Sequence, residues 1–141
     1  MWTPRLFLRN LLAFGFVAVV LFMMVEALLG SIVAVAVLFL APVSAAALCE
    51  GAGFARSGRT LPEGPQVWSV ARDMAESYLG ALVIISAIMA VSMPDFRLWL
   101  ARTSILTIAT LYGTTTLVAF VAIRWSYALG ARLALEKRNS N

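Results

Sequence analysis

The stretch Leu11–Leu48, LLAFGFVAVVLFMMVEALLGSIVAVAVLFLAPVSAAAL, contains a single charged residue, Glu26, in 38 residues. As one helix it would be roughly 57 Å long, nearly twice the ~30 Å hydrocarbon core of a bilayer. Dividing it near Gly30-Ser31, where the two small residues favour a turn, gives two apolar segments of spanning length, Leu8–Val25 and Leu28–Leu48. The stretch therefore predicts two transmembrane helices joined by a tight connection.

Two further apolar segments follow in the second half of the chain. One covers Tyr78–Met93 and ends where Pro94 lacks a backbone donor and Asp95 favours water. The other covers residues 103–125, inside an apolar stretch that begins near Leu98. The sequence therefore predicts four transmembrane helices.

The composition supports a membrane protein. Of the 141 residues, 62% are hydrophobic and 13% are charged, whereas a soluble domain is about 45–50% apolar and about 25% charged. A domain of this length leaves much of its surface exposed, so one small core cannot hide that excess. We expect an all-α polytopic membrane protein, with residues 1–141 forming a single membrane domain.

The distribution of Lys and Arg predicts which ends face the cytoplasm, because basic residues concentrate on that side of a membrane. With four spans and a cytoplasmic N-terminus, nine basic residues face inward and two face outward, whereas three spans give four and seven. The favoured layout is two hairpins joined by a cytoplasmic loop, residues 49–77, with a cytoplasmic tail, residues 131–141. The inside set is Arg5, Arg9, Arg56, Arg59, Arg72, Arg124, Arg132, Lys137 and Arg138, and the outside set is Arg97 and Arg102.

The cytoplasmic loop contains signals for both turn and helix. The segment Gly51–Gly53 is expected to form a turn. A helix is expected to begin at Pro62 or Pro65, with Thr60 capping its free N–H groups and Glu63 reaching back, and to continue into the third span. The tail after the fourth span is expected to fray.

Glu26 and a row of threonines are the candidate functional residues within the spans. A carboxylate inside a bilayer often marks a proton or cation pathway, but at a hairpin apex in water or headgroups its cost is small. Four threonines fall on one face of the fourth span, with Gly113 beside them permitting close helix approach. That face suits helix packing or, alternatively, the lining of a pore. The threonines are Thr103, Thr107, Thr110 and Thr114.

The second span and the loop carry further candidates with two interpretations each. Small residues over Ala41–Ala47, with Pro42, favour tight helix packing, although a broken helix at a substrate site has a similar pattern. The loop arginines Arg56, Arg59 and Arg72 are explained as topology determinants or as ligands of an anionic lipid headgroup. Arg72 and Glu76 are spaced for an ion pair on one helix face.

Several kinds of chemistry are disfavoured. The chain has no histidine and a lone cysteine, Cys49, so imidazole ligands, His-dependent nucleophiles and an internal disulfide are absent. The carboxylates Glu50, Asp73 and Glu76 fit no strong metal-ligand spacing. The basic residues flank apolar segments and form no cluster with interleaved aromatics, so no nucleic-acid partner is expected. We expect no cofactor, no metal and no enzymatic activity.

The loop sequence FARSGRTLP, Phe54–Pro62, resembles that of a group of small proteobacterial inner-membrane proteins of unknown function. Those proteins look like four-span chains of similar length, with a close first hairpin and a loop containing an aromatic residue, Arg, Gly-Arg and Pro. The resemblance covers the layout of the whole chain and is specific only in this loop. It implies a bacterial inner (plasma) membrane location with cytoplasmic termini, and it implies no activity or substrate.

Two functions remain open at this point. We expect a non-catalytic helical bundle that acts through protein or lipid contacts, as an accessory subunit of a larger membrane complex. Its partners would be membrane lipids and either other subunits or further copies of the chain. The alternative is a small homo-oligomeric transporter or channel that uses Glu26 and the threonine face.

Overall fold

The structure is all-helical over the part of the chain that it describes. The computed structural model describes residues 4–29, 31–57 and 61–140, with side chains for residues 5–22, 38–57, 61–137 and 140. Within these ranges there are five helices and no strand. The helices are α1 (Pro4–Leu29), α2 (Ser31–Arg56), α3 (Gly64–Ser92), α4 (Pro94–Arg102) and α5 (Ile105–Asn139).

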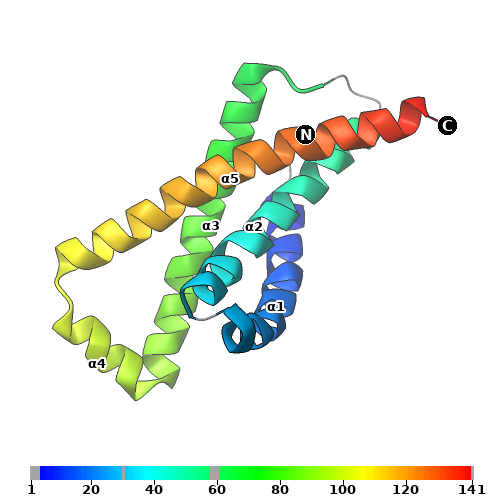
Figure 1. Ribbon diagram of the computed structural model, residues 1–141. Coiled ribbons are helices and arrows are strands. Elements are labelled where there is room, and N and C mark those ends of the chain that lie inside the picture. Colours follow the sequence, from blue (N-terminus) through cyan, green and yellow to red (C-terminus); the bar gives the residue numbers. More distant parts are fainter. Residues whose placement is uncertain (1–3, 30, 58–60, 141) are drawn as a thin grey trace.

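Four of these helices, α1, α2, α3 and α5, contain segments long and apolar enough to cross a membrane. In Figure 1, α3 descends from the top of the molecule, α1 descends from behind α5, α2 returns upward, and α5 rises diagonally across them. At about 1.5 Å per residue, the 35 residues of α5 extend roughly 50 Å. A helix of that length exceeds a ~30 Å hydrocarbon core, so it must tilt or extend beyond it.

Two predicted helix boundaries are confirmed. The long apolar stretch divides between Leu29 and Ser31, at the predicted break. The third long helix ends at Ser92, with Met93 extended as its C-cap, and Pro94 starts the next helix. The boundary at Met93 follows from backbone chemistry, because Pro94 has no N–H with which to continue the preceding helix.

Two expectations about the loop and the tail are wrong, because the segment expected as a turn and the tail expected to fray are both helical. Residues 49–56 continue α2, so the Gly51–Gly53 segment is helix rather than turn. At the other end of the chain α5 continues to Asn139, so the expected fraying tail is helical. The two extensions pack on each other, with Ala55 and Ala131 buried. The packing of these two helices outweighs the low helix propensity of glycine, which costs about 1 kcal/mol relative to alanine in a helix interior.

The start of α3 and the region before α5 also differ from expectation. The helix α3 begins at Gly64 and has Pro65 in its first turn, so the later of the two predicted starts is confirmed. Glu63 is the N-cap and its side chain makes no capping bond, while Thr60 lies outside the described residues. The expected fourth span is interrupted, because Thr103 is the C-cap of the short helix α4 and α5 starts at Ile105.

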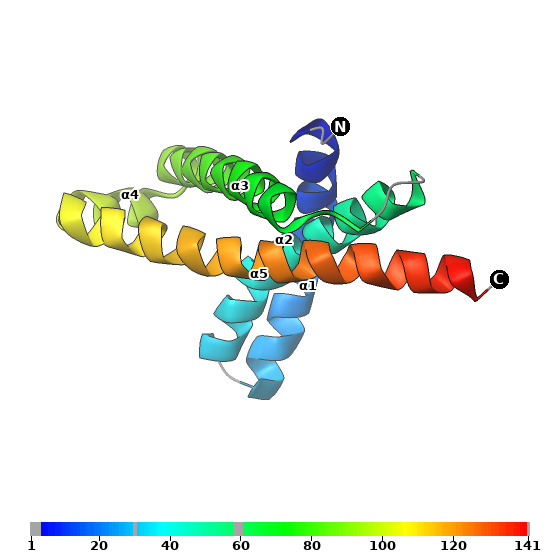
Figure 2. The ribbon, with the colours of Figure 1, turned by 90° about the horizontal axis from the view of Figure 1, so that it is seen from above.

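Buried side chains gather where the beginnings of α1 and α3 meet the ends of α2 and α5, a region we call the packed end. It comprises residues 7–18, 43–55, 67–78 and 119–131. The remaining part of the α3–α4–α5 layer, residues 79–118, contains no buried residue, and we call it the open end. In Figure 2, α5 runs between α3 on one side and the connected ends of α1 and α2 on the other. The core cluster contains Phe7, Leu11, Val43, Ala46, Ala47, Val67, Ala71, Met74, Ala75, Tyr78, Ala119, Ile123 and Tyr127.

At the packed end, α2 and α5 approach at backbone distance. A Cβ atom added to Gly51 would overlap the carbonyl oxygen of Tyr127, and one added to Gly130 would overlap that of Leu48. Small residues at such positions let helix backbones approach closely, which is how membrane helices gain van der Waals contact. The small residues over Ala41–Ala47 also serve packing, because Val43, Ala46 and Ala47 are fully buried in the core cluster.

Pro42 lies inside α2 without ending it. Its missing N–H leaves the carbonyl of Leu38, four residues earlier, without the usual helical donor. One residue further on, the carbonyl of Phe39 accepts a hydrogen bond from the Tyr78 hydroxyl of α3 at 3.3 Å. The interruption in the α2 ladder therefore lies where α3 reaches across to α2.

Candidate functional site

The crossing of α3 and α5 brings together an aromatic pair and an arginine. The rings of Trp68 and Phe120 have centroids 5.5 Å apart and are tilted by 39°. The Arg124 guanidinium carbon lies 4.1 Å from the centroid of the Trp68 ring. A cation over an indole face contributes about 0.5–1 kcal/mol when exposed and about 2 when desolvated. Arg124 is half-buried, and its contact with Trp68 keeps the guanidinium charge close to the surface of the two helices.

A small pocket of about 270 Å³ lies at this crossing. Its lining consists of Trp68, Ser69 and Arg72 from α3 and Phe120 from α5. Trp68 and Arg72 are one helical turn apart, as are Phe120 and Arg124, so each helix presents one ring and one guanidinium. The pocket thus has apolar walls, one hydroxyl and cationic groups at its edge.

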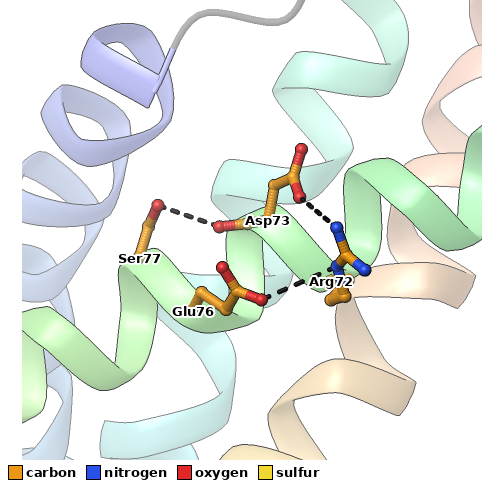
Figure 3. A network of polar contacts seen from close by, with 4 residues as sticks. All are labelled: Arg72, Asp73, Glu76 and Ser77. Atoms are coloured by element: carbon orange, nitrogen blue, oxygen red, sulfur yellow. Dashed lines mark hydrogen bonds and ion pairs between the residues drawn. The ribbon is translucent and has the colours of Figure 1, made fainter.

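The ion pair predicted between Arg72 and Glu76 is present (Figure 3). Arg72 Nε lies 3.6 Å from a Glu76 carboxylate oxygen, and Arg72 Nη2 lies 3.8 Å from a carboxylate oxygen of Asp73. Ser77 Oγ donates to the Asp73 carbonyl at 2.9 Å. The Arg72 and Glu76 side chains are 72% and 70% exposed, so the pair contributes little to stability and leaves guanidinium N–H groups accessible.

A second, larger hollow of about 580 Å³ lies on the outward face of α5. It is lined by Leu117, Val118, Val121, Ala122 and Trp125, all of them apolar. Leu117, Val121 and Arg124 follow at spacings of four and three residues, so they share one face of the helix. The hollow therefore runs along α5 from the level of Arg124 toward the open end.

The three arginines predicted as lipid ligands have different positions. Arg72 lines the pocket, Arg56 is exposed in the last turn of α2, and Arg59 lies outside the described residues. The sequence interpretation missed this arrangement, because it counted Arg124 only as a topology signal and predicted no contact between Trp68 and Arg124. Their one-turn spacing from Phe120 and Arg72 was the available signal, but nothing in the sequence indicates that α3 and α5 cross at that point.

Three of the four threonines, Thr107, Thr110 and Thr114, lie in α5, whereas Thr103 lies outside that helix. The Thr103 hydroxyl caps the end of α4 by donating to the Trp99 carbonyl at 2.7 Å, outside the helix that carries the others. In α5, Thr107 shares a bond with the Ser104 hydroxyl, and Thr110 donates to its own helix at the Leu106 carbonyl. Local bonds of this kind need no second helix.

Two further predicted residues of this group are exposed. Thr114 is exposed, and Gly113 has nothing within 4 Å of the place where a Cβ would stand. The close helix approach expected near Gly113 therefore does not occur among the described residues. Glu26 belongs to α1, but its side chain lies outside the described residues.

One side-chain bond joins the helices across the open end. The Tyr112 hydroxyl of α5 donates to the Ser86 hydroxyl of α3. It stands among exposed apolar residues, so it braces two helices that share little buried surface in this half of the molecule.

No metal centre is formed by the described residues, among which no three His, Cys, Asp or Glu side chains gather closely enough to hold an ion. Glu50 lies on α2, whereas Asp73 and Glu76 lie on α3 beside Arg72. The most chemically distinct surface in the described part of the chain is thus the aromatic and cationic pocket of the α3–α5 crossing. No known protein family, curated protein or solved structure matches this chain.

Proposed function

We propose that this chain is a non-catalytic membrane protein that acts through protein and lipid contacts, as an accessory subunit of a larger membrane complex. The observation that carries the proposal is the contrast between its two ends. Residues 79–118 expose apolar side chains throughout and contain no buried residue. A surface of that extent, on helices suited to a bilayer, requires lipid or another protein as its cover.

Small residues in the open end favour a protein cover for part of it. Gly80 and Gly113 are exposed, and the space beside each is open. Within a bilayer, lipid covers bulky aliphatic side chains as well as a helix does, whereas small residues gain most from a helix that approaches closely. Two glycines of the packed end, Gly51 and Gly130, are used in this way between α2 and α5.

The proposed orientation places the packed end at the cytoplasmic side of a bacterial inner membrane, with α1–α2 and α3–α5 as two hairpins. The support is the nine-to-two distribution of basic residues. Arg97 and Arg102, the outer pair, both belong to α4. The Phe96 and Trp99 rings of that helix stack at 5.6 Å, and aromatic rings are typical anchors at a membrane interface. Membership of the small proteobacterial four-span proteins stays a prediction.

The test is a detergent-free extraction of the chain from its native membrane, followed by mass measurement of the intact particle and identification of everything bound. The expected result is a particle that contains at least one other protein subunit. A monomer without a partner would contradict the proposal. A particle made only of copies of this chain would also overturn it and favour the transport alternative, for which Glu26→Gln should abolish a pH-dependent flux.

A further inference from the structure

We propose that the α3–α5 crossing binds an anionic phospholipid, with the headgroup phosphate at the pocket of Trp68, Ser69, Arg72 and Phe120 beside Arg124. This inference rests on the part of the proposed function that places these helices in a bilayer. It does not depend on the accessory-subunit role. The two ideas can therefore fail separately.

The charge at this crossing is available to an anion. Among the described residues Arg124 has no ion pair, and its guanidinium lies against the Trp68 ring. A ring does not neutralise the guanidinium or consume its in-plane N–H donors. Arg72 is shared between two carboxylates, but at 3.6 and 3.8 Å and 72% exposure these pairs are weak. Phosphate oxygens would compete with these carboxylates for Arg72. They would also accept hydrogen bonds from the paired N–H donors of the Arg124 guanidinium.

The neighbouring groups suit a phosphate at a membrane interface. The Ser69 hydroxyl, at the pocket wall, is a donor for a phosphate oxygen. Trp68 is 48% exposed, and tryptophan is the residue typical of the headgroup level of a membrane. Basic pockets between membrane helices on the cytoplasmic side are typical sites for anionic headgroups.

The apolar hollow on α5 decides between a lipid and a free phosphate. It is lined by Leu117, Val118, Val121, Ala122 and Trp125, of which Leu117 and Val121 lie nearest the helix face of Arg124. A free phosphate ion would leave this hollow unused, whereas a phospholipid would lay one acyl chain along it. Val121 and Leu117 lie three and seven residues before Arg124, so an acyl chain would have an apolar path along α5 toward the open end, and we commit to the lipid.

The experiment measures lipid retention by the full-length chain. Purified protein in detergent is supplied with phosphatidylglycerol or, at equal chain length, phosphatidylcholine, and bound lipids are counted by native mass spectrometry. We expect a first phosphatidylglycerol molecule to be retained in preference to phosphatidylcholine. Arg124→Gln should weaken that first binding roughly fivefold, because a basic residue near a membrane surface contributes about 1 kcal/mol to anionic lipid binding. Arg124→Lys should restore only part of it, because lysine keeps the charge and lacks the fork of guanidinium donors.

Matched variants separate the site from general charge. Arg132→Gln removes the same charge from an exposed position on α5 and should leave the first binding unchanged. Glu76→Gln frees Arg72 and should strengthen binding, whereas Glu63→Gln, an equal charge change at the exposed start of α3, should not. Helicity and elution volume of each variant verify that it has folded.

Three results would overturn the proposal. Equal retention of the two lipids would remove the headgroup selectivity. Equal weakening by Arg124→Gln and Arg132→Gln would reduce the effect to net charge. Displacement of the lipid by millimolar inorganic phosphate would show a free-anion site instead. None of these results bears on whether the native particle contains a partner subunit, so the accessory-subunit proposal is judged independently.

Discussion

The packed end and the open end are built from helices of the same chain and similar hydrophobicity, yet they differ in what their helices contact. At the packed end, glycine and alanine let α2 and α5 touch through their backbones around buried Ile123 and Met74. At the open end, α3 and α5 are joined by α4 and by the bond between Tyr112 and Ser86. In a bilayer, apolar character alone does not bring helices together, so close packing depends on shape. The predictions below test this contrast.

The largest effect is expected where backbones meet. Gly51→Ala places a methyl group onto the carbonyl oxygen of Tyr127, which no rotamer change can relieve. We expect a loss of about 3 kcal/mol in unfolding free energy, the upper part of the range for overpacking. Gly113→Ala, with open space beside it, should be neutral or stabilise by up to about 1 kcal/mol. Reversible denaturation of the purified chain measures both, and equal effects would refute the contrast.

Truncation of a core side chain should have the next largest effect. Ile123 is fully buried, and Ile123→Ala should cost about 2 kcal/mol, near the lower end for such cavities because lipid-like surroundings reduce the transfer contribution. Ile88, 59% exposed on α3, provides the control, and Ile88→Ala should cost well under about 1 kcal/mol. The same denaturation assay applies. A cost at Ile88 matching that at Ile123 would mean that the open end is packed within the chain.

The bond across the open end should matter less. Tyr112→Phe removes the donor to Ser86 and should cost about 0.6 kcal/mol, the average for side-chain hydrogen bonds between membrane helices. Thr110→Val removes a bond that stays within α5 and should change stability by less than that. Hydrogen exchange of the α3 and α5 backbone amides would locate the loosening. If Thr110→Val proved the more damaging change, α5 would owe its position to its threonines.

The smallest effect on stability is expected at the exposed ion pair. Glu76→Gln breaks the contact with Arg72, which should cost about 0.3–0.5 kcal/mol or less. The cost should vanish at high salt, because exposed charges are screened. A loss above about 1 kcal/mol that persists in salt would show that this network supports the packed end directly.

The sequence predicts the helix content and the main breaks because both follow from local chemistry. The split near Gly30-Ser31 and the stop at Met93-Pro94 need no tertiary information, and both are confirmed. The extent of α2 and α5 was not predictable from glycine and charge, since residues 51–56 and 131–139 are helical where the two helices pack together. Local sequence signals give the intrinsic conformational preference of a segment. In these two segments the tertiary contacts outweigh that preference.

In the candidate site, too, the contacts within one helix are predictable from the sequence and the contacts between helices are not. The Arg72–Glu76 pair is a one-turn spacing on one helix, and the sequence predicts it correctly. The meeting of Trp68 with Phe120 and Arg124 depends on how α3 and α5 cross, which no periodicity encodes. The threonine face was predicted as one helix, but the chain breaks at Ser104, whose hydroxyl accepts the Thr107 amide as an N-cap. This N-cap could have been predicted from the sequence, because a serine directly before an apolar run is a typical helix start.

The most direct test of the central claim is site-specific photo-crosslinking in native membranes. A photoreactive amino acid replaces Leu106 at the open end, which is 78% exposed, and in a separate variant Leu12 at the packed end, which is 68% exposed. We expect adducts to another protein from position 106, and adducts to lipid alone from position 12. Lipid adducts alone from position 106, or the same protein adducts from both positions, would contradict the claim that the open end is an interface for a partner subunit.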